Sequence, residues 1–167
     1  QPRSRGLGDV YKRQLRDHNT ARSVTDVFED LYSRLEHDDY YRLFPVILTD
    51  RGSEFSNPTA IEKDADGHSR SRIFYCNPSA PYQKGGIEVS HELIRRILPK
   101  GTSFDNLQQE DIDLMLSHIN SYKRDKLNNR SAYQLFSFIY GESILNKLNV
   151  HELQPNDIVL SPKLLRK

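Results

Sequence analysis

The chain has 167 residues, the length of one domain, and its apolar fraction of 36% is enough to build a hydrophobic core. It contains no run of 18 apolar residues and no charged-then-apolar leader, so we expect a cytoplasmic protein without a membrane span. The single cysteine, Cys76, excludes an intrachain disulfide and a cysteine-rich zinc module. We expect Cys76 to be a buried strand residue.

The formal net charge of +1 gives no argument for nucleic-acid binding, because residues 1–14 hold four cations against Asp9 alone. This stretch has no apolar periodicity, and its ending, DVYKRQ, resembles a translated sequencing-adapter read. We therefore interpret residues 1–14 as a non-native leader. The alternative is a natural basic arm that binds phosphates.

Apolar spacing and capping residues predict a mixed α/β chain. The predicted helices are one that follows Thr20 and breaks at Glu36–Tyr41, a short one at Pro58–Lys63, and longer ones at Gly86–Leu98, Leu107–Arg124 and Ser131–Gly141. The predicted strands are Phe44–Leu48 and Arg72–Cys76, and a small hairpin or strand is predicted around Ile158–Leu160. The first strand is wholly apolar, which is typical of a strand that is buried on both faces.

Two carboxylates stand out by position. Asp50 follows the first predicted strand and precedes a turn that contains Gly52. The strand would hold the Asp50 carboxylate in place, and the turn would leave it accessible to solvent and substrate. An aspartate after a strand is also a common turn residue, and the signal needs a partner. Glu88 lies near the start of the predicted helix that begins at Gly86. Glu92 lies one turn later on the same helix face and could assist a metal site, but a solvated helix carboxylate is the favoured interpretation, and the same holds for His91.

Several ordered motifs run from about Leu15 to Lys167. They are Thr20-Ala21-Arg22-Ser23-Val24, Tyr75-Cys76-Asn77-Pro78, Tyr82-Gln83-Lys84-Gly85-Gly86-Ile87-Glu88, Leu93-Ile94-Arg95-Arg96, Leu98-Pro99-Lys100-Gly101, Asn120-Ser121-Tyr122 and Asn128-Asn129-Arg130-Ser131. In these motifs the chain resembles the DDE transposases of insertion-sequence family thirty (IS30-like). The resemblance implies an α/β, RNase H-like (retroviral-integrase-type) catalytic core, followed by a helical C-terminal region.

The resemblance also implies the chemistry. Three carboxylates, two Asp and one Glu, would hold two Mg²⁺ (or Mn²⁺) ions that support phosphoryl transfer on DNA. Asp50 matches the second Asp and Glu88 matches the Glu, so both are expected to be catalytic residues and metal ligands. Water would nick the end of the insertion element, and the freed 3′-hydroxyl would attack target DNA.

DNA is the implied partner, both as element ends and as target, and a homo-oligomer that acts at the bacterial nucleoid is implied as well. Candidate phosphate contacts are Lys84, Arg95, Arg96 and Lys100 beside the predicted metal site. A second group consists of Lys123, Arg124, Lys126 and Arg130. For both groups a solvated charged face is the equal alternative.

One part of the family pattern has no match, because no residue takes the place of the first Asp, which should lie on an upstream strand. We therefore expect an N-terminally truncated core at residues 15–104 and a helical region at residues 105–167. The expected function is that of a transposase fragment, inactive alone, from an enzyme that cuts and joins DNA. The alternative is a catalytically inactive RNase H-like module that binds DNA or a partner subunit.

Overall fold

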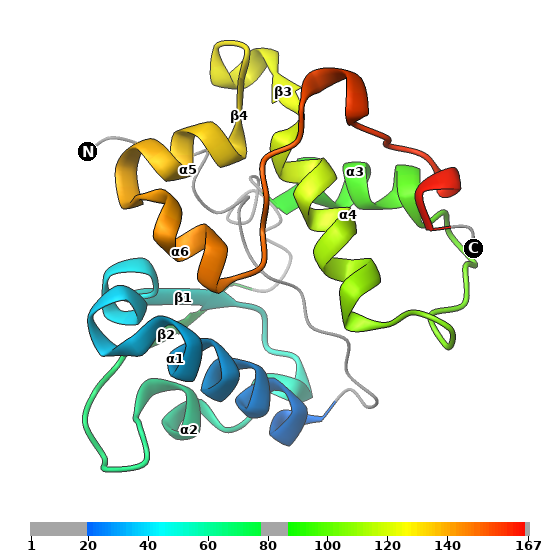
Figure 1. Ribbon diagram of the computed structural model, residues 1–167. Coiled ribbons are helices and arrows are strands. Elements are labelled where there is room, and N and C mark those ends of the chain that lie inside the picture. Colours follow the sequence, from blue (N-terminus) through cyan, green and yellow to red (C-terminus); the bar gives the residue numbers. More distant parts are fainter. Residues whose placement is uncertain (1–19, 78–86, 166–167) are drawn as a thin grey trace. The chain divides into compact units, whose positions relative to one another are not determined.

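The computed structural model describes residues 20–77 and 87–165, and the chain divides into two compact units near residue 84 (Figure 1). Each unit is described by itself. Within the described residues, no helix is long and apolar enough to cross a membrane. The domain boundary expected at residue 105 stays a prediction.

Helix α1 (Ala21–Leu43) opens the first unit and begins as predicted at Thr20. The Thr20 hydroxyl accepts the backbone N–H of Ser23, whose own hydroxyl accepts the backbone N–H of Thr20, so both exposed donors are satisfied. The expected break at Glu36 is a kink, because Glu36 has φ 63° and ψ 168° and the helix resumes to Leu43. The buried side chains of α1 are Val24, Leu31, Leu35 and Tyr40.

Two short strands form a parallel pair in this unit. Strand β1 (Val46–Thr49) lies in register with β2 (Arg72–Tyr75), so that Val46 pairs with Arg72 and Thr49 with Tyr75. The connection contains the 3-10 turn η2 (Ser53–Phe55) and helix α2 (Pro58–Glu62), which Asn57 caps. Strand, helix and parallel strand together make a βαβ unit.

The prediction that the first strand is buried on both faces is wrong for this structure. Val46 and Leu48 are 57% and 46% exposed, and Phe74, the register partner of Leu48, is 53% exposed. Thr49, whose side chain is on the opposite face from Leu48, is only 4% exposed. One face of the pair is therefore covered and the other is an apolar, exposed surface.

Arg70 is the largest fully buried side chain of the first unit. Its Nε donates to the carbonyl of Ile61 at 3.0 Å, and its Nη2 donates to the carbonyl of Ala60 and to Glu29, both at 2.8 Å. The guanidinium also lies 5.0 Å from the ring centroid of Tyr32. Arg70 thus ties α1 to the end of α2 through charge-assisted hydrogen bonds.

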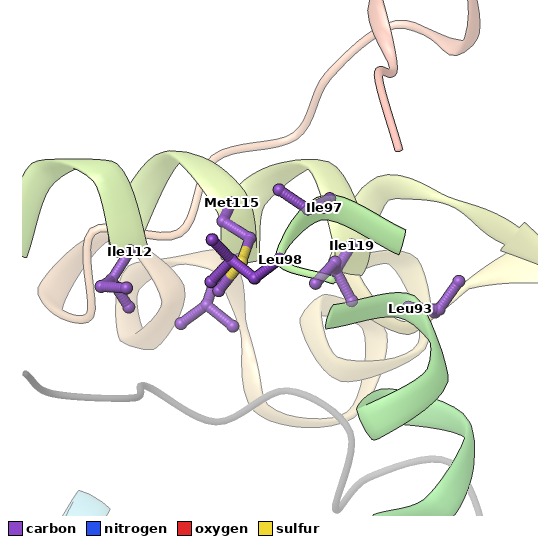
Figure 2. Packing of buried hydrophobic residues seen from close by; sticks show 7 residues of the cluster. Leu93, Ile97, Leu98, Ile112, Met115 and Ile119 are labelled. Atoms are coloured by element: carbon purple, nitrogen blue, oxygen red, sulfur yellow. The ribbon is translucent and has the colours of Figure 1, made fainter. Parts of the chain in front are cut away.

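The second unit is mainly helical. Helix α3 (Ile87–Ile97) packs against α4 (Gln109–Ser121), and Figure 2 shows the buried aliphatic side chains of the two helices and of Leu98 between them. The cluster comprises Leu93, Ile97, Leu98, Ile112, Met115, Leu116 and Ile119. These are the apolar positions whose spacing predicted both helices.

The chain then forms a small hairpin of β3 (Lys123–Arg124) and β4 (Arg130–Ser131), closed by η4 (Asp125–Leu127). The helix predicted to extend to Arg124 therefore ends at Ser121. Helix α5 (Ala132–Tyr140) begins at Ser131 as predicted, and α6 (Glu142–Lys147) follows Gly141.

The predicted tail strand at Ile158–Leu160 is wrong, because this segment has no regular structure between η5 (Pro155–Asp157) and η6 (Pro162–Leu165). It is held instead by side chains of α4. The backbone N–H of Val159 donates to Nδ1 of His118, and that of Leu153 donates to the hydroxyl of Ser121. These contacts satisfy backbone donors that a strand would pair with a neighbour.

Candidate functional site

Asp50 lies where the sequence places it, immediately after β1, and it is exposed. The backbone N–H of Gly52 donates to its Oδ1 at 3.3 Å, as in a turn that an aspartate initiates. Thr49 directly before it is buried and paired with Tyr75, so the backbone that carries the carboxylate is fixed by the sheet. A carboxylate on a rigid strand end can bind a hard cation without reorganisation of the backbone.

The turn after Asp50 is also tied to β2. The hydroxyl of Tyr75 donates to the carbonyl of Phe55 at 2.6 Å, which anchors η2. The Glu54 carboxylate occupies the space where a Cβ on Gly52 would be, so a side chain at position 52 would displace the end of Glu54.

Glu88 lies in the first turn of α3, as predicted, but its side chain and those of Ile87 and Val89 lie outside the described residues. Asp50 belongs to the first unit and Glu88 to the second. Their convergence on one metal site stays a prediction. Tyr82 and Lys84 also fall outside the described residues.

The other predicted phosphate contacts near α3 differ in their surroundings. Arg95, Arg96 and Lys100 are all exposed. Nη2 of Arg96 is 2.8 Å from Oε1 of Glu92, one turn earlier, and this ion pair raises the pKa of Arg96. Arg96 therefore has a partner on its own helix, and Glu92 is a solvated helix carboxylate rather than a lone acid beside Glu88.

A cluster of two carboxylates and a histidine lies between α2 and β2, and no pattern in the sequence pointed to it. One donor atom from each of Asp64, Asp66 and His68 lies within 4.8 Å of the others, close enough to hold a metal ion. Asp64, however, accepts the backbone N–H groups of Asp66 and His68 and the hydroxyl of Tyr32. Burial raises the pKa of Asp64, but these hydrogen bonds outweigh it and the pKa lies below its usual value. The cluster is explained as a turn that a carboxylate stabilises.

No protein-family model matches this chain, and no solved structure matches it. Several curated proteins do match it. A candidate integrase, ORF3, of Spiroplasma virus SpV1-R8A2 B is 31% identical over 72% of this chain and 35% of its own length. The transposase for insertion sequence element IS1086 of Cupriavidus metallidurans is 35% identical over 40% of this chain and 20% of its own.

The transposase InsI for IS30A of Escherichia coli is 28% identical over 68% of this chain and 26% of its own length. The matched part thus spans about a third or less of each of these relatives. A transposase from Bacteroides fragilis, for IS4351, matches over 60% of the chain as well. Over most of its own length, the chain is a distant homologue of the IS30-family transposases and of a phage integrase.

Proposed function

We propose that this chain supplies part of the catalytic core of a DDE transposase, in which Asp50 and Glu88 hold divalent cations for phosphoryl transfer on DNA. The exposed carboxylate of Asp50 at the end of a sheet-paired strand is the observation that carries the proposal. The homology to transposases and an integrase supports the same chemistry.

The proposed fold of this core is RNase H-like. The order α1, β1, α2, β2, α3 and the parallel pairing of β1 with β2 support it. In that arrangement a strand end and the start of a helix supply the carboxylates, which are the positions of Asp50 and Glu88. The third carboxylate of the family pattern has no assigned residue here.

Asp50 fits the role of a ligand for Mg²⁺ or Mn²⁺, because both cations prefer carboxylate oxygen and the side chain is exposed. The N–H of Gly52 orients Oδ1, and the pairing of Thr49 with Tyr75 fixes the backbone. A bound cation would polarise the phosphate and lower the pKa of an attacking water or hydroxyl.

A chimaera tests the proposal. Residues 20–165 would replace the matching part of the E. coli IS30A transposase, and end cleavage and end binding would be measured separately. We expect the chimaera to cleave, and Asp50→Asn and Glu88→Gln each to reduce cleavage at least about 100-fold, since a metal supplies several kcal/mol to the transition state. Asp64→Asn is the matched control and should cleave normally.

Cleavage that survives Asp50→Asn would contradict the proposed role of this carboxylate. A chimaera that binds element ends but does not cleave them would favour the second candidate function, a catalytically inactive binding module.

A further inference from the structure

We propose that the hairpin of residues 123–131, here called the cationic hairpin, binds the phosphate backbone of DNA. The inference rests on the proposed function for the choice of DNA, but it concerns a different surface from Asp50 and Glu88. The hairpin consists of β3, η4 and β4 and precedes α5 directly.

Positive charge is dense in this hairpin. Residues 123–131 contain four Lys and Arg residues but only one Asp, whereas the rest of the segment 87–165 contains five Lys and Arg residues and nine Asp and Glu residues. A cluster of cations with few acids is where a polyanion would bind, because neighbouring carboxylates oppose its attraction to phosphates only weakly.

Three of the four cationic side chains of the hairpin are exposed and are not neutralised by acidic side chains of the described residues. Lys123, Lys126 and Arg130 are exposed. Among the described residues, none of these three side chains forms an ion pair or a hydrogen bond. Arg96, by contrast, is paired with Glu92. Cations without an acidic partner can neutralise phosphates without first breaking an ion pair.

The hairpin also places like charges together. Arg124 and Arg130 are register partners across the antiparallel ladder, where like charges are destabilising. Arg124 is 8% exposed, whereas Arg130 remains at the surface, so Arg130 is the member of this pair that can contact a phosphate.

The backbone of the hairpin is fixed, so the cations need little ordering on binding. The N–H of Asn129 donates to the carbonyl of Arg124 at 3.1 Å, and the N–H of Asn128 donates to the carbonyl of Asp125 at 3.0 Å. Asn128 and Asn129 both have positive φ, 54° and 58°, a conformation that asparagine tolerates better than most residues. A preorganised loop loses less entropy on binding than a flexible one.

The experiment is a titration of a fluorescent DNA duplex with the full chain, followed by anisotropy at several salt concentrations. The test variant is Lys126→Gln with Arg130→Gln, which alters two exposed side chains. The matched control is Lys63→Gln with Lys163→Gln, which removes the same charge from exposed positions elsewhere. Circular dichroism of both variants checks that they fold.

We expect the hairpin variant to raise the Kd at least about tenfold and to lower the slope of log Kd against log salt by about 1.8, since each lost phosphate contact contributes about 0.9. The control pair should change neither. The titration contains EDTA and no divalent cation, so its outcome does not depend on the proposed metal site, and failure of the hairpin is distinguished from failure of that site.

The proposal is overturned if the hairpin variant binds DNA as tightly as the wild type, if the control pair loses as much affinity, or if the chain binds no duplex at low salt. Weakened binding of polyglutamate with unchanged binding of DNA would point to an acidic protein partner and would also overturn it.

Discussion

Among the described residues, Arg70 of the first unit and Asn120 of the second are both completely buried, and they differ in their hydrogen bonding. Arg70 in the first unit is 0% exposed and donates to two carbonyls and a carboxylate. Asn120 in the second unit is also 0% exposed, but neither its Oδ1 nor its Nδ2 has a hydrogen-bond partner. Of the nitrogens of the Arg70 guanidinium, only Nη1 lacks a hydrogen-bond partner.

Arg70 and Asn120 show that burial of a polar side chain does not by itself stabilise the fold. A buried polar group that is hydrogen-bonded contributes to stability, whereas one without partners costs the free energy of its lost hydration. The first unit has short strands and an exposed apolar sheet face, so it depends on Arg70 to join α1 and α2. In the second unit, the aliphatic cluster of α3 and α4 contributes stability, and the unpaired amide of Asn120 reduces it.

The largest expected effect is that of Arg70→Met. The substitution leaves the carbonyls of Ala60 and Ile61 without their donor, and we expect the first unit to lose about 3 to 4 kcal/mol of its free energy of unfolding. Amide hydrogen exchange of α1 measures this unit alone. Arg96→Met, which removes an exposed ion pair from the second unit, should cost less than about 1 kcal/mol. Equal effects of the two substitutions would refute the role assigned to Arg70.

A smaller effect of opposite sign is expected for Asn120→Leu. Leucine has a similar volume and no polar atoms, so the second unit should gain about 1 to 2 kcal/mol, measured by amide exchange in α4. The matched control is Asn146→Leu, a change of the same kind at an exposed helix position. Loss of stability in Asn120→Leu would mean that the carboxamide has a partner in solution.

The smallest effect concerns His118, where burial lowers the pKa and the charge of Asp157 opposes that shift. The Nδ1 atom accepts the N–H of Val159, so the neutral ring holds the tail. The lowered pKa means that the unfolded chain binds a proton at His118 more tightly than the folded chain does. The neutral ring therefore stabilises the folded state above the ordinary pKa of 6.5, and this stabilisation is lost as the pH falls through the folded-state pKa.

Exchange protection of the Val159 amide should therefore fall as the pH drops below about 6.5. His118→Gln should remove this pH dependence, whereas substitution of the exposed His151 by Gln should keep it. A pH dependence that is the same in the wild type and His118→Gln would show that another group is responsible.

Local signals in the sequence predicted much of the fold. Thr20 and Ser131 cap helices as expected, because a capping hydroxyl acts within three residues. The tail strand at Ile158–Leu160 was wrong because the side chain of His118, far away in sequence, takes up the N–H of Val159. The burial of Arg70 could not be predicted either, since its acceptors come from α1 and α2.

For the candidate site, as for the fold, the sequence predicted the local positions of the residues but not their contacts with distant parts of the chain. The position of Asp50 after a strand and of Glu88 in the first turn of a helix followed from local patterns. The cluster of Asp64, Asp66 and His68 was missed because alternating polar residues between two elements are typical of any loop. Whether the two proposed ligands meet depends on contacts distant in sequence, which no local pattern encodes.

The central proposal is that Asp50 and Glu88 are ligands of divalent cations. Residue-resolved NMR line broadening by millimolar Mn²⁺ tests it most directly, because a paramagnetic ion broadens nearby amides even when it binds weakly. We predict that the amides around Gly52 and those of the first turn of α3 broaden at the same Mn²⁺ concentration, and that Asp50→Asn abolishes both. Broadening confined to Asp64–His68, or broadening near Asp50 without α3, would contradict the claim.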